Sequence, residues 1–169
     1  MPLSFGFPPI ASPTARVLVL GTLPGRLSLE RSEYYANPQN GFWRIANACT
    51  GRDVPDDYAL RVASLAESQV ALWDVLAAAT RSGSLDSAIR DDAIPNNFGA
   101  FFHAHTRIKL VCFNGATAAK LYRRHVVPTL TADQNAIELR TLPSTSGAHA
   151  AMSLVEKRKR WSVVWSSGG

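Results

Sequence analysis

The sequence predicts an α/β fold, a three-layer αβα domain with a central, mostly parallel four-stranded sheet. The first observation is a set of apolar runs of strand length, at residues 16–20, 69–75, 108–113 and 136–142. The second is that helical patterns separate these runs, which is typical of parallel strands joined by crossover helices. The third is that Gly, Pro, Asn or Asp follows each run, as expected where a strand ends.

Helix signals lie between the predicted strands. Residues 42–49 follow Asn40, a plausible N-cap, and stop at Gly51. Asp56 or Asp57 is placed to cap a helix that runs through residues 60–66. A further helix is expected after Gly115, and a last one over residues 154–161. Residues 81–86 are expected to form a loop and then a helix capped by Ser84, with no functional weight.

The strand ends mark the expected ligand site. Right-handed crossovers bring the turns at residues 21–24, 73–74, 114–115 and 143–146 to one edge of the sheet. In open α/β sheets, ligands bind at that edge. The segment 34–43 adds aromatic rings and carboxamides just beyond the first strand. These groups suit a planar, polar, uncharged ligand such as a nucleobase.

Length and charge indicate one domain with a polyanionic partner. The chain has 169 residues and a net charge of +5, and a basic balance favours nucleic acid. We expect a single domain over residues 1–169, with an extended N-terminal arm at 1–15, a frayed end at 166–169 and a monomeric state. No apolar run approaches transmembrane length and no signal pattern is present. These absences predict a cytoplasmic protein, nucleoid-associated if bacterial, without a membrane partner.

Several site chemistries are disfavoured. Two cysteines are too few for a disulfide framework or an iron–sulfur cluster. The four histidines lack zinc-ligand spacing, and no G-x-S-x-G elbow is present. The sequence therefore predicts neither a metal nor a cofactor.

Two segments and one side chain admit both a functional and a structural interpretation. Ser144, Thr145 and Ser146 follow a proline turn, where hydroxyls and free N–H groups either bind phosphate or cap a helix. The basic run 157–160 either meets DNA phosphates or forms a solvated helix face. Asp74, at a strand end, either reads a base edge or caps a turn.

Three short motifs resemble the uracil-DNA glycosylase superfamily. Residues 21–25 resemble its first motif, and residues 142–146 its second. Residues 37–43 resemble the His-Pro-x-Asn-x-Phe-Trp segment of the mismatch-specific branch. Together with residues 28–30, 34–35 and 113–115, the set is most similar to the hypoxanthine-DNA glycosylase branch, also called DNA-deoxyinosine glycosylase. The resemblance spans residues 16–161.

The resemblance implies a monofunctional glycosylase that flips a deaminated base, above all hypoxanthine, out of double-stranded or single-stranded DNA and hydrolyses its N-glycosidic bond in base excision repair. It makes Asn40 the catalytic candidate. It assigns Tyr35 to stacking on the base. Thr22 and Leu23 are expected to face a base carbonyl through their backbone N–H groups, and Asp74 is a base-binding candidate from its place at a strand end. The expected DNA-binding residues are Ser144, Thr145, Ser146, Ala148, His149, Lys157, Arg158 and Lys159.

Three departures from the family pattern keep alternatives open. Many members carry Asp or Asn where this chain has Leu23, and His or Asn where it has Leu142. The hypoxanthine branch shares both losses, but Gly147 stands where that branch usually has Pro. The alternatives are a uracil-preferring, mismatch-specific glycosylase and a nucleic-acid-binding domain without catalysis. A small-molecule enzyme with a phosphate cradle is disfavoured, because neither G-x-G-x-x-G nor a Walker pattern occurs.

Overall fold

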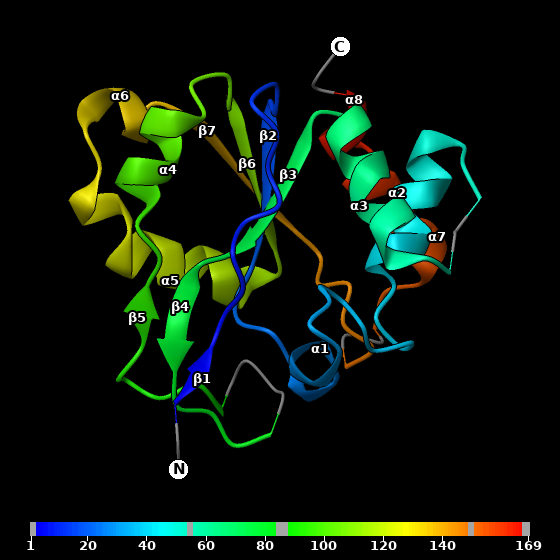
Figure 1. Ribbon diagram of the computed structural model, residues 1–169, viewed down its shortest axis with the longest axis horizontal. Helices are drawn as coiled ribbons and strands as arrows, with labels where there is room; N and C mark the ends of the chain where they lie inside the picture. The colour runs from blue at the N-terminus through cyan, green and yellow to red at the C-terminus, as the bar shows by residue number, and fades with distance from the viewer. Residues whose placement is uncertain (1–2, 54–55, 84–87, 149–150, 167–169) are drawn as a thin grey trace.

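A parallel four-stranded sheet forms the centre of the domain, as expected from the sequence. The computed structural model describes residues 3–53, 56–83, 88–148 and 151–166. Its sheet has the order β3-β2-β6-β7 (Figure 1), with every neighbouring pair parallel. The strands are β2 (Val17–Gly21), β3 (Val70–Asp74), β6 (Leu110–Asn114) and β7 (Glu138–Leu142). Each lies within two residues of its predicted bounds, so the fold class is confirmed.

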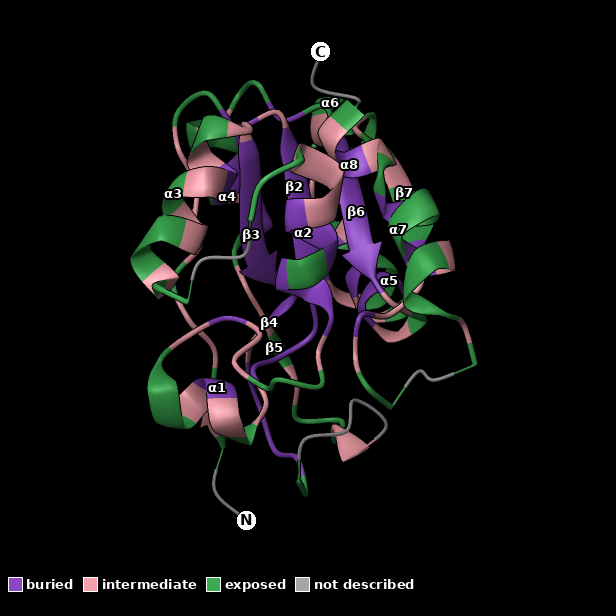
Figure 2. Ribbon diagram, turned by 90° about the vertical axis from the view of Figure 1, so that its right-hand side faces the viewer, coloured by how far each residue is buried: buried purple, intermediate pink, exposed green. Residues whose placement is uncertain are grey.

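Alternation along the inner strands sends side chains into two separate cores. Leu18 and Leu20 of β2 pack on one face of the sheet, whereas Val17 and Val19 pack on the other. All residues of β2, β3 and β6 are buried, and Figure 2 shows these strands inside the helical layers. A strand buried on both faces reads as a continuous apolar run, which is why these strands were predictable.

Helices cover both faces of the sheet (Figure 1). One layer contains α4 (Phe98–Ala104), α5 (Ala116–His125) and, beyond the short 3₁₀ turn η2 (Val127–Thr129), α6 (Ala132–Asn135). The other contains α2 (Phe42–Thr50), α3 (Tyr58–Glu67), α7 (Leu154–Trp161) and α8 (Val163–Ser166). The short helix α1 (Arg26–Arg31) comes after β2. No helix among the described residues is long and apolar enough to cross a bilayer.

A small antiparallel sheet was not predicted. It has the order β1-β4-β5, with β1 (Ser4–Phe5), β4 (Leu76–Ala79) and β5 (Ile94–Pro95). The N-terminal segment is docked rather than free, since β1 pairs with β4 and Ile10 exchanges two 2.8 Å backbone hydrogen bonds with Leu72. Strands of two residues carry no periodicity, so the sequence could not reveal them. The frayed end predicted for 166–169 is wrong at Ser166, which is the last residue of α8. The predicted helix cap at Ser84 and residues 167–169 lie outside the described residues.

Local capping explains where the helices on one face begin. Of the two candidate caps for α3, the structure uses Asp57, whose carboxylate accepts from Leu60 N at 3.3 Å.

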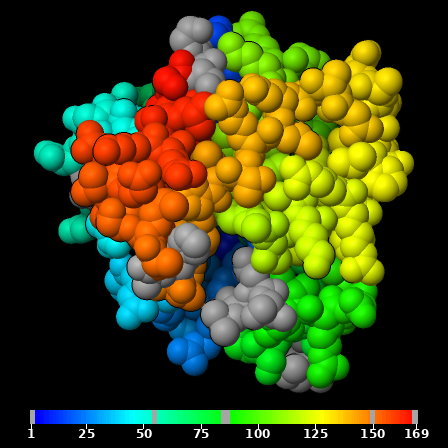
Figure 3. Space-filling model, turned by 180° about the vertical axis from the view of Figure 1, so that it is seen from behind, coloured from blue at the N-terminus to red at the C-terminus, as the bar shows by residue number. Residues whose placement is uncertain are grey.

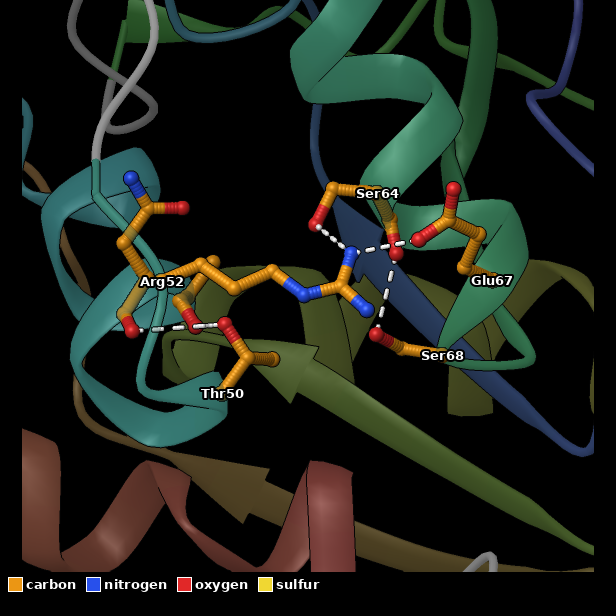
Figure 4. Close-up of polar contacts among 7 residues, drawn as sticks. Thr50, Arg52, Ser64, Glu67 and Ser68 are labelled. Carbon is orange, nitrogen blue, oxygen red and sulfur yellow. Dashed lines mark hydrogen bonds and ion pairs between the residues drawn. The ribbon is translucent and has the colours of Figure 1, made fainter.

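Figure 4 shows how Arg52, just after α2, reaches across to α3: its guanidinium donates to Ser64 Oγ at 3.2 Å and to Glu67 Oε2 at 2.6 Å. Both charged side chains are largely exposed, so this ion pair contributes little to stability.

Trp161 ties the last helices to the loop after β7. Its side chain is fully buried and packs edge-on against Phe42, with ring centroids 5.9 Å apart. Its indole N–H donates to the Pro143 carbonyl at 2.8 Å. One side chain thus fixes the position of the loop after β7 relative to the start of α2.

The first prediction concerns this anchor. Trp161→Phe removes the indole donor and leaves the Pro143 carbonyl unsatisfied, so we expect the free energy of unfolding to fall by about 2 kcal/mol or more. Urea denaturation followed by circular dichroism measures this change.

Trp165→Phe is the matched control. The Trp165 indole nitrogen is buried but makes no hydrogen bond to the described residues, so this change removes a ring without removing a bond. If Trp161→Phe lowers the free energy of unfolding no more than Trp165→Phe does, the hydrogen bond to Pro143 contributes nothing to stability.

Candidate active site

The ends of three strands and the loop after β7 converge at one edge of the sheet. Gly21 ends β2, Asp74 ends β3 and Asn114 ends β6. Gly115 N donates to the Leu142 carbonyl at 3.0 Å, which joins the end of β6 to the end of β7. Seen from behind (Figure 3), the blue N-terminal part of the chain lies at the floor of a hollow between the orange region before α7 and the yellow-green α5. The polar side chains that end β3 and β6, Asp74 and Asn114, are themselves buried.

Asn40 is held against the loop after β7. Its Oδ1 accepts from Phe42 N at 3.0 Å and from Thr145 Oγ1 at 2.8 Å. Gly41 N donates to the Thr145 carbonyl at 2.9 Å. Gly41, and not Asn40 as expected, is the N-cap of α2. Asn40 supports the helix start from the position just before this N-cap. Among the described residues, Asn40 Nδ2 donates to none.

Asn114 connects Thr145 to Tyr35. Its Oδ1 accepts from Thr145 N at 2.9 Å, and its Nδ2 donates to Thr145 Oγ1 at 2.8 Å and to the Tyr35 hydroxyl at 3.0 Å. A continuous polar network therefore runs from Asn40 through Thr145 and Asn114 to Tyr35. Sequence reasoning placed residues 114–115 at the expected ligand edge and in a motif, but it gave the Asn114 side chain no role in the site.

Tyr35 lies in the site with one ring face already covered. Its ring stacks on Phe42, with centroids 4.4 Å apart and planes 24° from parallel. Its backbone has φ 54°, a left-handed conformation that is uncommon outside glycine. The Tyr34 ring lies beside the same side chain, at 6.5 Å between centroids and tilted by 46°.

Glycine at position 21 makes room for Asp74 and Tyr35. A Cβ there would lie 2.6 Å from Asp74 Oδ1 and 3.0 Å from the Tyr35 hydroxyl, so any side chain would displace both. Asp74 is buried at the end of β3. Burial first, and the Asp74 charge second, raise the pKa of Tyr34, so that phenol stays protonated and donates to the Pro8 carbonyl at 2.9 Å. The two tyrosines therefore differ in role. Tyr34 is a buried structural residue that holds the N-terminal segment, and Tyr35 lies at the site.

Hydrogen bonds from the chain at the junction of β3 and β4 hold the backbone carbonyl groups of the turn after β2. The Gly21 and Thr22 carbonyls accept from Val75 N at 2.9 Å and Leu76 N at 3.1 Å. A trans peptide places N–H opposite the preceding C=O. The N–H groups of Thr22 and Leu23, both expected to face a base, therefore point away from β3 and β4.

Arg81 anchors the next two carbonyls of the same turn. Its guanidinium donates to the Leu23 carbonyl at 3.3 Å and to the Pro24 carbonyl. The side chain is only 7% exposed. Sequence reasoning missed this residue, because a lone arginine in a polar segment carries no sign that it will bind backbone groups far back along the chain.

The hydroxyls expected to bind phosphate are placed differently from one another. Thr145 is 2% exposed and engaged by Asn40 and Asn114, so it lies inside the domain and not at a phosphate-facing surface. Ser144 and Ser146 are half-buried, and their Oγ atoms accept from Ser146 N at 3.1 Å and Ala148 N at 3.2 Å. Ala148 is exposed, whereas His149 lies outside the described residues.

Close packing against Gln39 accounts for Gly147. A Cβ at position 147 would lie 3.0 Å from Gln39 Cβ and 3.1 Å from the Gln39 carbonyl oxygen. The loop after β7 and the turn before Asn40 therefore touch through this glycine as well as through Thr145.

The basic run on α7 is not a uniform solvated face. Lys157 is 5% exposed and lines a pocket of about 170 Å³ together with Arg44, and burial lowers the pKa of its ammonium. Arg158 is exposed but donates to the Ala48 carbonyl at 3.3 Å. Lys159 is exposed. The three expected DNA-binding cations therefore occupy three different environments.

No group of three or more His, Cys, Asp or Glu side chains in the described part of the chain could hold a metal ion. The polar groups that converge at the strand ends are mostly carboxamides, hydroxyls and backbone N–H groups, with Asp74 as the buried carboxylate. Such a set can hold a flat polar ring by stacking and hydrogen bonding.

Comparisons with known proteins agree on one family. Residues 8–165 match the family model described as the uracil DNA glycosylase superfamily. Proteins named hypoxanthine DNA glycosylase from Methanosarcina acetivorans and Methanosarcina barkeri are each 34% identical over 161 residues, which is 95% of this chain and 96% of each relative. A solution NMR structure from M. acetivorans, described as a candidate uracil DNA glycosylase, superposes with a TM-score of 0.81 at 32% identity and covers 98% of both chains.

The second prediction tests the anchoring of the turn by Arg81. Arg81→Met keeps much of the apolar side chain but leaves the Leu23 and Pro24 carbonyls without this donor, so the free energy of unfolding should fall by about 1–3 kcal/mol. Urea denaturation without DNA measures it. Arg107→Met, at an exposed arginine, should change stability by about 0.5 kcal/mol or less. Equal stability of the two variants would contradict the anchoring role.

Proposed function

The chain belongs to the uracil DNA glycosylase superfamily, and on that premise we propose that it is a monofunctional DNA glycosylase that removes hypoxanthine from DNA in base excision repair. The observation that carries the proposal is the site built around Asn40, in a chain whose full-length relatives are named hypoxanthine DNA glycosylases. A carboxamide, an aromatic ring and a carboxylate meet at the sheet edge where a flipped base can enter.

Each base-facing group has a role in the proposed reaction. The flipped base stacks on the Tyr35 ring, which Phe42 supports by stacking at 4.4 Å between centroids. Asp74 accepts the lactam N–H of hypoxanthine, and the N–H groups of Thr22 and Leu23 face its acceptors. Flipping costs a few kcal/mol, least for a mismatched base. Asn40 is the catalytic residue of the proposal.

The chemistry is hydrolysis of the bond between C1′ of the sugar and the base nitrogen. The bonding electron pair leaves with the base, and a water oxygen bonds to C1′. Leu23 and Leu142 occupy the positions where many family members carry a polar side chain, so neither takes a proton from that water. Rate enhancement then comes mainly from fixed dipoles that stabilise charge on the departing base.

The DNA backbone is proposed to lie along the loop after β7 and the start of α7. Ser144, Ser146, Ala148 and His149 flank the lesion, while Lys157, Arg158 and Lys159 supply positive charge. The net charge of +5 supports this surface. We propose a single-domain monomer that acts in the cytoplasm on double-stranded or single-stranded DNA.

A uracil-preferring glycosylase is the second candidate. The structural relative from M. acetivorans is described as a candidate uracil DNA glycosylase. Uracil and hypoxanthine share a lactam edge, an N–H beside a carbonyl, so Asp74 and the turn after β2 serve both bases. A domain that binds DNA without cleaving the glycosidic bond is the outcome if Leu23 and Leu142 have abolished catalysis.

The third prediction is the activity itself. Purified protein is incubated in EDTA with labelled duplexes that carry hypoxanthine, uracil, xanthine or ethenoadenine, and alkali then reveals abasic sites. We expect cleavage of the hypoxanthine duplex first, because the full-length relatives are named hypoxanthine DNA glycosylases. Faster cleavage of uracil would select the second candidate, and binding without cleavage the third.

Asn40→Ala is the control for that assay. The single-turnover rate should fall by about a hundredfold or more, the scale expected for one positioned polar group. Folding should survive, since losing support at a helix start costs about 1 kcal/mol. A variant that melts earlier but keeps its rate would limit Asn40 to a structural role.

The fourth prediction separates the Tyr35 ring from its hydroxyl. Tyr35→Ala should weaken binding to lesion DNA by about 1–3 kcal/mol, the usual worth of a base–aromatic contact. Tyr35→Phe keeps the stacking face and should be mild. Fluorescence anisotropy with lesion and undamaged duplexes measures both. Equal damage from the two changes would assign the effect to the hydroxyl bonded to Asn114.

A further inference from the structure

We propose that Thr145 is a positioning residue that fixes the Asn40 carboxamide with its amino group turned toward the base. Asn40 then acts as a hydrogen-bond donor to the departing base and not as an acceptor for the attacking water. This inference rests on the proposed glycosylase function. It also replaces the expected role of Thr145 at the DNA phosphates.

Two backbone N–H groups fix the direction of every hydrogen bond in the network. Thr145 N can only donate, so the Asn114 atom 2.9 Å from it is the carbonyl oxygen. Asn114 Nδ2 therefore faces Thr145 Oγ1 and donates to it at 2.8 Å. The Thr145 hydroxyl accepts there, which leaves its single proton for Asn40.

The other end of the network is fixed in the same way. Phe42 N lies 3.0 Å from Asn40 Oδ1 and can only donate, and Thr145 Oγ1 lies 2.8 Å from that same oxygen. A flipped carboxamide would place its amino group against the Phe42 N–H, donor against donor. Both acceptor positions of Oδ1 are therefore used, and Asn40 presents Nδ2, which only donates.

Burial makes this arrangement firm. Thr145 is 2% exposed and Asn114 7% exposed, so water does not compete for their bonds. Within a low-dielectric interior, a fully satisfied network resists reorientation. The carboxamide of Asn40 is consequently set before the base arrives, as electrostatic catalysis requires.

A hydrogen-bond donor at this place stabilises the departing base and not the attacking water. When the C1′–N bond breaks, its electron pair moves onto the purine, whose ring nitrogens and carbonyl oxygen become stronger acceptors. Nδ2 of Asn40 stabilises that charge. The water that bonds to C1′ releases its proton to solvent, and the base takes a proton from solvent, so Asn40 neither gains nor loses one.

The fifth prediction uses two conservative changes at position 145. Thr145→Val removes the hydroxyl and should lower the single-turnover rate on hypoxanthine DNA by about tenfold or more, whereas Thr145→Ser keeps the hydroxyl and should restore most of it. In an Asn40→Ala background, Thr145→Val should have no further effect, since residues that act as a unit are not additive. A loss of about tenfold in both backgrounds would make Thr145 independent of Asn40 and overturn the proposal.

Asn40→Asp tests donation against water activation. A carboxylate offers only acceptors, so the variant should be slow at neutral pH and recover as acid protonates the carboxyl and restores a donor. Enzyme-free duplex at each pH corrects for acid depurination. A variant that is as fast as wild type at neutral pH would show that Asn40 works through water, and the proposal would fail.

A measurement on the free protein separates this proposal from the proposed function. The side-chain amide signals of Asn40 and Asn114 in a ¹⁵N–¹H spectrum are assigned with Asn40→Ala and Asn114→Ala. Thr145→Val should shift both, and Thr145→Ser should shift them little. Unchanged signals in Thr145→Val would overturn the positioning role. An inactive wild type with shifted signals would sink the glycosylase function while the contact itself stands.

Discussion

The reciprocal pair between Thr145 and Asn114 is the contact on which the site depends. Asn114 ends a strand that is buried on both sides, so its side chain starts from a rigid position. From it, one bond reaches the Tyr35 hydroxyl, and two reach Thr145, which in turn holds Asn40 and Gly41. Segments more than a hundred residues apart in sequence thus meet through carboxamide and hydroxyl groups. Such a buried network is stable only when each member is satisfied, because an orphaned polar group would cost about 1–3 kcal/mol.

Apolar packing holds the same segments from the other side. Trp161 lies behind the loop after β7, donates to the Pro143 carbonyl and touches Phe42. Phe42 carries the stacked ring of Tyr35. The polar network and the aromatic stack therefore share their end points, the start of α2 and the loop after β7. The polar network and the aromatic stack therefore hold each other in place. In the proposed function, a base that enters the site meets groups whose spacing is already set.

Elements with a continuous local pattern were predictable from the sequence. Buried parallel strands read as apolar runs, which is why β2, β3 and β6 were found. The edge strand β7, which is mostly exposed, was also predicted, and the caps of α2 and α3 were found to within one residue. The small β1-β4-β5 sheet was missed because β1 and β5 have only two residues each and β4 follows β3 almost directly. Asn40, Tyr35 and Asp74 were named from motifs and strand ends, and the structure brings them to one edge. Thr145 was assigned to phosphate because a hydroxyl cluster after proline has two interpretations, and only its burial at 2% exposure decides between them. The role of Arg81 could not be predicted from the sequence, because its partners are backbone carbonyls of the turn at residues 23–24.

Leucine at positions 23 and 142 has a physical consequence beyond the loss of polar groups. Leu23 and Leu142 are each 6% exposed and pack into the two cores on opposite faces of the sheet. They therefore lower the dielectric beside the strand ends, where hydrogen bonds act most strongly. A site built this way contains no group at these positions that could take a proton from water, but it strengthens every fixed donor around the base. Under the proposed mechanism, such a site accelerates the reaction by stabilising the leaving group, which suits a base whose anion spreads charge over several acceptors. A purine with a lactam, such as hypoxanthine, has more of these acceptors than uracil, and in the proposed reaction the donors of Asn40 and the turn after β2 would address them from two sides.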